Sequence, residues 1–423
     1  MKDAAKILEG RSIGNIPTLG TNWNDWDERL DINRMKKERL KKTQESIKKA
    51  GLGAILCYDW GNTRYLGALP YQTWAYPKGY QYVLLPKNGD PILWTIGTRT
   101  RQIRDQMMMS WGGRIFGNHE VEWALIGGGD PDPFFKDIKK ILYEHGVLNE
   151  PLGIDKPQYT VDLKEKFKKE GINLVDGMLP MLAAREVKTQ DEIYCMNIAA
   201  AISEVSFEAV RANIRPGARE CDVMAEGIRA AIQAGNGTMG EYCFCSGERT
   251  NRNMLNFSDK MIRPGEIVFV DNGGTTFLGY NTCYYRTFCC GKATERQKEM
   301  YAEALELLYN STRLIKPGTS TADIVKLWPT CDYWGCKTDY EAMECFIIHG
   351  IGLSVHEGPV ASRHTSLKNP VKFREGNVCA IETWVGRDNP REGARIEEEF
   401  VVTKDGVEFI SKWPVGQITE CWI

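Results

Sequence analysis

The stretch that decides the fold is FIIHGIGLSVHEGP, residues 346–359, in which an apolar run leads into a histidine and a glycine-rich turn. His349 follows the apolar residues, and His356 stands seven positions later. A single histidine beside a glycine is more often a hydrogen-bonded core residue than a ligand. Its meaning therefore depends on the polar residues that other strands place near it.

Three strands in the same half of the chain contain carboxylates where a buried face predicts apolar residues. Asp271 ends IVFVD, Glu382 ends VCAIE, and Glu397 lies within ARIEEEFVV. Alternation in the last strand puts Glu397 and Glu399 on one face and Glu398 on the other. Taken singly, each could be a turn residue or part of a solvated edge. Together with one imidazole, they suit one or two divalent ions of iron, zinc, manganese or cobalt, because an ion offsets the desolvation of buried carboxylates.

Four segments, in this order along the chain, resemble the ordered motifs of the pita-bread enzymes: VDNGGTTFLGYNTCYYRTF, HGIGLSVHEGP, AIETWVG and RIEEEFVVTKDG. The resemblance spans roughly Asp191 to Lys412. This superfamily includes methionine aminopeptidase, prolidase and creatinase. The resemblance implies a pita-bread catalytic domain at residues 190–423. It also implies that Asp271, His349, Glu382 and Glu397 are metal ligands, and Cys283, at the position of the family's remaining ligand, is a further metal candidate. His356 would be a proton-handling or substrate-polarising residue, with Glu357 as a second catalytic candidate.

The N-terminal half has the texture of an α/β domain. An amphipathic helix is predicted from Ile32 to Ala50, followed by buried strands in AILCYD, QYVLLP and PILWTIG. The segment DWGNTRYLGA is predicted as a strand followed by a polar turn and an aromatic residue. Residues 31–180 resemble, more weakly, the accessory domain of prolidase and creatinase, and residues 1–30 are expected to form an irregular arm.

The C-terminal half is predicted to be α+β. Helices are expected from Asp191, as the N-terminal cap, to Asn213, from Glu220 to Ala234, and from Thr294 to Ile315. Between and after them, the runs EIVFVDNGG, GYNTCYYRTF, NVCAIETWV and ARIEEEFVVT are typical of antiparallel strands.

Two positions depart from the peptidase pattern. The family usually has a metal-binding aspartate where GYNTCYYRTF has Cys283, and a thiolate is softer than a carboxylate and bridges two hard ions poorly. Met254 stands where peptidase relatives usually have a histidine, and methionine cannot transfer a proton. The SG-x-R-T-N sequence resembles the pita-bread type of dimethylsulfoniopropionate lyase and implies that Arg249 and Asn251 bind substrate. That lyase, however, keeps the aspartate.

These departures favour a metal-dependent lyase or hydrolase that cleaves a carbon–heteroatom bond in a small charged compound, similar to dimethylsulfoniopropionate lyase. The alternatives are an Xaa-Pro dipeptidase or aminopeptidase, a creatinase-type amidinohydrolase, and a binding protein without activity. Trp60, Tyr65 and Trp74 belong to an aromatic-rich segment that could enclose a sulfonium or ammonium group. Packing in the core or between subunits is the alternative role for these rings.

Net charge and cysteine content indicate which classes of partner and which compartment to expect. The formal net charge of -2 gives no electrostatic case for nucleic acid or a membrane surface. The N-terminus does not resemble a signal peptide, and the thirteen cysteines lack the paired spacing of a structural zinc site, so free thiols in the cytoplasm are expected. The resemblance to the creatinase and lyase branches further implies a homodimer.

Overall fold

The computed structural model describes residues 30–67, 81–95, 115–117, 132–155, 160–237, 240, 242–251 and 256–423. The chain divides into two compact units, Met1–Arg185 with Thr189–Asp191, and Glu186–Lys188 with Glu192–Ile423. Most of the expected N-terminal arm, together with Trp74 and Met254, lies outside the described residues. The expected homodimer therefore stays a prediction.

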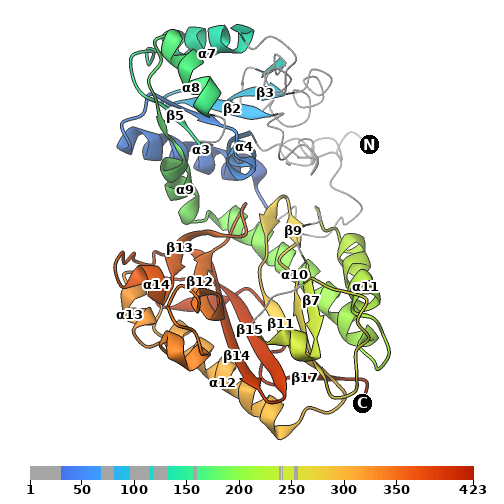
Figure 1. Ribbon diagram of the computed structural model, residues 1–423. Helices are drawn as coiled ribbons and strands as arrows, with labels where there is room; N and C mark the ends of the chain where they lie inside the picture. The colour runs from blue at the N-terminus through green and yellow to red at the C-terminus, as the bar shows by residue number, and fades with distance from the viewer. Residues whose placement is uncertain are drawn as a thin grey trace, which may run out of the picture. The chain divides into compact units, whose positions relative to one another are not determined.

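The N-terminal unit contains a six-stranded sheet with helices packed around it (Figure 1). The strand order is β4-β3-β2-β1-β5-β6. The strands are β1 Ala54–Cys57, β2 Tyr82–Pro86, β3 Ile92–Thr95, β4 Ile115–Gly117, β5 Leu152–Ile154 and β6 Leu174–Asp176, and the helices are α3 Ile32–Lys49, α4 Trp60–Gly67, α7 Asp132–Glu144, α8 Thr160–Lys169 and α9 Met178–Glu186. Parallel and antiparallel pairs both occur in the sheet. The predicted α/β class is confirmed.

The prediction for DWGNTRYLGA was wrong, because most of this segment is helix α4. Asp59 begins the helix: its carbonyl accepts from the Thr63 amide at 2.8 Å, and its carboxylate accepts from the Asn62 amide at 3.2 Å. An aspartate that satisfies free amides at a helix start is a strong initiating signal. Its position directly after β1 made the segment resemble a strand end.

Helix α10 Gln190–Asn213 confirms the predicted long helix, but Asp191 is not its cap. Asp191 lies inside the first turn, where its carboxylate accepts from Arg34 Nε at 2.8 Å and Arg34 Nη2 at 2.7 Å. Within the described part of the chain, α10 is the one helix long and apolar enough to cross a membrane, and half of its most apolar window is buried in the protein. It is a core helix.

The C-terminal unit is built on two main sheets and a short hairpin. The sheet orders are β17-β11-β8-β7, β13-β12-β14-β15-β16 and β10-β9. The strands are β7 Cys243–Ser246, β8 Ile267–Asp271, β9 Thr276–Phe277, β10 Tyr280–Asn281, β11 Tyr285–Cys290, β12 Phe346–Gly350, β13 Glu357–Ala361, β14 Val378–Asp388, β15 Arg391–Val402, β16 Val407–Phe409 and β17 Thr419–Cys421. Most strand pairs are antiparallel, as predicted.

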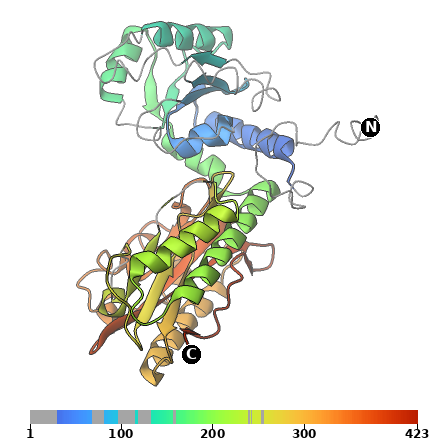
Figure 2. The same ribbon diagram turned by 90° about the vertical axis from the view of Figure 1, so that its right-hand side faces the viewer.

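Helices cover both main sheets of this unit. They are α10, α11 Glu220–Gln233, α12 Glu295–Thr312, α13 Thr321–Val325 and α14 Arg363–Ser366. Figures 1 and 2 show α10 and α11 side by side over the sheet that holds β7, while α12 packs on β14 and β15. Thr294 caps α12 in a reciprocal capping box with Gln297. The predicted α+β class and its helices are confirmed.

The two main sheets meet where β11 approaches β15. The Thr287 hydroxyl donates to the Arg395 carbonyl at 2.6 Å and accepts from the Arg395 amide at 2.9 Å. The predicted continuous strand GYNTCYYRTF is interrupted just before this contact, between β10 and β11, because the Cys283 amide faces the Glu399 carboxylate instead of a neighbouring strand. This break lies opposite the polar face of β15.

Candidate metal centre

The centre of the site is a histidine between two glutamates. His349 Nε2 lies 3.3 Å from Glu382 Oε1 and 3.8 Å from Glu397 Oε1, and all three side chains are buried. Glu382 and Glu397 are directly paired across β14 and β15, so their side chains share one face of the sheet. His349 Nδ1 lies 3.0 Å from the Gly350 carbonyl oxygen, to which it donates. In the neutral imidazole this hydrogen bond places the lone pair at Nε2, as in a metal-ligating histidine.

The pKa values of His349, Glu382 and Glu397 are shifted in different directions by burial and by their mutual contacts. Burial lowers the pKa of His349, but hydrogen bonds to Glu382 and Glu397 outweigh burial and raise it to about 10. Burial, followed by the charge of Glu382, raises the pKa of Glu397 well above its usual range. Burial also raises the pKa of Glu382, but the hydrogen bond from His349 outweighs burial and lowers it. Without a cation, two adjacent buried carboxylates cannot both hold full charge.

Cys283 and Asp271 extend this group from the opposite sheet. The ligand atoms of Cys283, His349 and Glu397 lie within 4.8 Å of one another. A methyl group on Gly273 would lie 3.4 Å from Asp271 Oδ1 and 3.8 Å from Cys283 Sγ, so both side chains flank the same glycine. Burial, followed by the charges of Glu397 and Asp271, raises the pKa of the Cys283 thiol well above its usual range.

The buried polar atoms of this group fit a divalent cation. Among the described residues, Oε1 of Glu399 has no hydrogen-bond partner, and His349 Nε2 and the carboxylate oxygens of Glu397 make no well-aligned hydrogen bond beyond the close contacts within the group itself. Leaving buried donors and acceptors unpaired costs free energy, and buried carboxylates cost more. One imidazole, several carboxylates and a thiol are ligands that zinc, iron, cobalt and manganese accept in different proportions.

His356 lies at the exposed rim of this group. Its ring centroid is 4.4 Å from that of His349, and His349, His356 and Glu382 form a second set with ligand atoms within 4.8 Å of one another. Burial, followed by the charge of His349, lowers the pKa of His356. An exposed imidazole beside the buried group is placed to meet a substrate.

Glu357, the second catalytic candidate, has a different environment. Its carboxylate lies 2.9 Å from Lys188 Nζ and accepts from the Ser354 amide at 2.9 Å. Both charged side chains are only 1% exposed. The pair fixes the turn that carries His356, which favours a positioning role for Glu357.

Two of the predicted substrate-binding residues, Arg249 and Asn251, make contacts with residues other than the candidate ligands. Arg249 is engaged by Glu220, by the Ser258 hydroxyl at 2.7 Å and by the Asn256 carbonyl at 2.9 Å. Asn251 Nδ2 donates to Asp388 Oδ1 at 2.9 Å. Trp60 and Tyr65 lie in α4 of the N-terminal unit, where the Tyr65 hydroxyl donates to the Ala184 carbonyl.

Three residues of the site were not predicted from the sequence. The Tyr285 hydroxyl donates to Glu382 Oε2 at 3.3 Å. Arg395 is buried on the same face of β15 as Glu397, and its charge helps to lower the pKa of Glu382. The third residue is Glu399. Burial raises the pKa of its carboxyl group to about 8, although hydrogen bonds from Thr282 and Cys283 act to lower it. Strand alternation alone places Arg395 and Glu399 on the face of Glu397.

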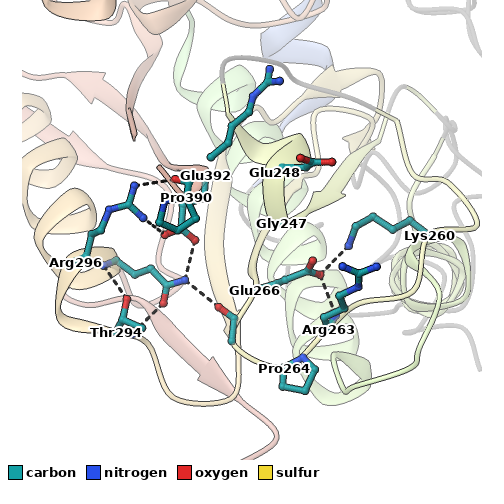
Figure 3. Close-up of a pocket in the computed structure, with 13 residues that line it drawn as sticks. Gly247, Glu248, Lys260, Arg263, Pro264, Glu266, Thr294, Arg296, Pro390 and Glu392 are labelled. Carbon is teal, nitrogen blue, oxygen red and sulfur yellow. Dashed lines mark hydrogen bonds and ion pairs between the residues drawn. The ribbon is translucent and has the colours of Figure 1, made fainter. Parts of the chain in front are cut away.

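A pocket of about 690 Å³ opens elsewhere in the C-terminal unit, and none of the candidate ligands lines it (Figure 3). Several of its charged side chains are already paired. Lys260 lies 2.7 Å from Glu266, and Arg296 lies 2.6 Å from Glu392. This pocket therefore does not belong to the metal centre.

Comparisons with known proteins identify both units. The sequence profile of the Creatinase/Prolidase N-terminal domain matches residues 39–187, and that of metallopeptidase family M24 matches residues 194–404. The Xaa-Pro dipeptidase of Pyrococcus furiosus is 28% identical over 69% of this chain and 82% of its own length. The dimethylsulfoniopropionate lyase DddP of Roseovarius nubinhibens is 22% identical over 91% of this chain and 87% of its own length.

A solved structure, the Xaa-Pro dipeptidase from Bacillus anthracis, superposes with a TM-score of 0.74. It is 23% identical in sequence, and the match covers 91% of this chain and 99% of that one. The likeness shows that the two proteins share a fold across both units.

Proposed function

The chain belongs to the pita-bread superfamily, as an enzyme with a Creatinase/Prolidase N-terminal domain and a metallopeptidase family M24 domain, and on this premise we propose that it is a metal-dependent Xaa-Pro dipeptidase. The observation that carries the proposal is the buried group of His349, Glu382 and Glu397, whose imidazole and carboxylates converge without a well-aligned hydrogen bond at His349 Nε2 or at either oxygen of Glu397. The relatives support it as well, since more of them are named as dipeptidases than as lyases. They favour the peptidase alternative over the lyase expected from the sequence.

The residues of the site supply complementary parts of a hydrolysis. His349, Glu382 and Glu397 would hold a divalent ion, with Asp271 and Cys283 completing its surroundings. A bound ion would supply Lewis-acid polarisation of the scissile carbonyl. His356 would donate to the substrate or accept its proton from the rim, because its imidazole is exposed.

The ion pair of Lys188 and Glu357 would position His356 rather than take part in the chemistry. Glu357 is next to His356 in sequence, and its carboxylate is held on both sides by Lys188 and the Ser354 amide. A carboxylate held on both sides by these contacts is fixed in place, which suits a residue that orients its neighbour.

A lyase similar to DddP is the second candidate. The observation in its favour is the relative from Roseovarius nubinhibens, which aligns along 91% of this chain. The position of Cys283 in the ligand group does not separate the two candidates, because the lyase branch and the peptidases both have an aspartate there. Under this alternative the same group would hold the carboxylate of a small sulfonium or ammonium compound.

Parallel assays of one metal-loaded preparation distinguish the two candidates. We expect hydrolysis of Ala-Pro and Gly-Pro with manganese or cobalt, and no release of dimethyl sulfide from dimethylsulfoniopropionate. Glu397→Gln should lower kcat/KM by at least about 100-fold, because even residues that only orient ligands contribute 10–100-fold. Glu408→Gln, an exposed glutamate of β16, is the matched control. Release of dimethyl sulfide without hydrolysis of either dipeptide would contradict the dipeptidase proposal and support the lyase.

A further inference from the structure

Glu399 occupies the same layer of side chains as His349. In the five-stranded sheet, His349 pairs with Ala380 on β14, and Ala380 pairs with Glu399 on β15. Directly opposed residues point to the same face, so the three side chains form one row. The central member is alanine, which leaves room above β14 between the imidazole and the carboxylate. Glu399 is fully buried and lies two residues from Glu397 on that face.

The carboxylate of Glu399 is anchored through one oxygen only. Oε2 accepts from the Thr282 hydroxyl at 2.6 Å, and the Cys283 amide lies 3.4 Å from the same oxygen. Oε1 is buried and has no hydrogen-bond partner among the described residues. The two donors come from the break between β10 and β11 that also carries the Cys283 side chain. Glu399 is therefore fixed beside Cys283 with one oxygen still unsatisfied.

The neighbouring Glu398 provides a comparison, because its buried carboxylate has structural partners on both oxygens. Glu398 points to the opposite face, where its Oε2 lies 3.0 Å from Arg286 Nη2 and also accepts from the Ser411 hydroxyl. Its second oxygen accepts from the Tyr309 hydroxyl at 3.4 Å. Both carboxylate oxygens of Glu398 have a hydrogen-bond partner, whereas Oε1 of Glu399 has none in the described structure.

We propose that Glu399 is an additional metal ligand, which supplies through Oε1 a hard oxygen donor on the Cys283 side of the centre. The inference rests on the metal centre of the proposed function and extends its ligand set. A thiol at position 283 cannot bridge hard ions, and a carboxylate beside it restores the oxygen donor that hard or borderline divalent ions prefer. The Thr282 and Cys283 donors hold the carboxylate in place, as hydrogen bonds to the non-ligating oxygen commonly do in metal sites.

Manganese titration of chelator-treated protein by calorimetry, with metal content measured after dialysis, tests this role without any assay of activity. The variant is Glu399→Gln, whose amide oxygen still accepts from Thr282 and Cys283 while the anionic donor is lost. We expect its manganese affinity to fall at least about tenfold, or one bound ion to be lost where wild type binds two. The metal-free variant should melt no lower than metal-free wild type.

Glu398→Gln is the matched control, one residue away and on the other face of the same strand. It should melt at a lower temperature and keep wild-type manganese binding, and Glu408→Gln serves as an exposed control if Glu398→Gln does not fold. Wild-type affinity and stoichiometry in Glu399→Gln would overturn the inference and leave Glu399 with a buried water or a structural role. That result would not affect the proposed function, whereas failure of wild type to bind manganese would overturn both.

Discussion

Cys283 lies among acidic groups that would suit a carboxylate ligand better than a thiol. Its Sγ lies within 4.8 Å of ligand atoms of His349 and Glu397, and burial and the charges of Glu397 and Asp271 raise the pKa of the thiol well above its usual range in the metal-free protein. A protonated thiol is a weak ligand. The sequence prediction that this residue separates the chain from its peptidase relatives thus has a structural basis in its surroundings.

The substitution Cys283→Asp should raise the rate of Xaa-Pro dipeptide hydrolysis with manganese by roughly tenfold or more, since a carboxylate can bridge two hard ions. The measurement is kcat/KM for Ala-Pro. A buried core cysteine such as Cys379 would be a poor control, because a carboxylate there would disturb the core. Cys221→Asp, at a partly exposed thiol, is the suitable control. An unchanged rate in Cys283→Asp, together with efficient hydrolysis by wild type, would show that Cys283 only fills space.

The candidate ligands could be proposed from the sequence, whereas the environment of Glu399 could not, for a physical reason. Asp271, Glu382 and Glu397 stand out because each interrupts an apolar strand, and buried charge demands compensation. Alternation also placed Glu399 on the face of Glu397. What faces Glu399 is a break in a different sheet, and periodicity within one strand says nothing about a contact across two sheets.

Among the elements, the turn between β12 and β13 depends on one buried ion pair. Lys188, just before α10, reaches Glu357 at the start of β13, and both are buried. Lys188→Met should lower the free energy of unfolding by about 3–5 kcal/mol, because it leaves the buried charge of Glu357 without its cation. Chemical denaturation of the metal-free protein gives this value.

The double variant Lys188→Met/Glu357→Leu is the control for that prediction. It removes both charges, so it should recover much of the stability lost in the single variant. Both variants should hydrolyse Ala-Pro more slowly than wild type, since each lacks the ion pair that holds the turn with His356. A double variant as unstable as the single one would show that the pair contributes through packing rather than charge.

The elements that sequence patterns predicted well are those with a strong local signal. Helix α12 has its capping box, and α3 has Asp31 as a cap that accepts from the Arg34 amide. Asp191 was misjudged because an aspartate near a helix start looks the same whether it caps the helix or pairs with a distant arginine. Arg34 is 157 residues away in sequence, so no local pattern reveals the pairing.

For the molecule as a whole, both fold classes and the superfamily followed from the order of motifs, while the function did not. The motifs indicate a family whose members include both peptidases and a lyase among the relatives of this chain, so the sequence could not separate the two. Substrate choice depends on side chains that surround the ligands, and several of the predicted ones either make structural contacts, as Arg249 does, or lie outside the described residues.

The central claim is that the C-terminal unit holds a divalent ion through His349, Glu382 and Glu397. Elemental analysis of protein purified without added metal, and again after incubation with manganese and dialysis, tests it most directly. We predict at least one divalent ion per wild-type chain, and loss of that ion in the double variant Glu382→Gln/Glu397→Gln, which removes both anionic ligands. Wild-type protein free of metal after incubation, or a double variant with the same metal content as wild type, would contradict the claim.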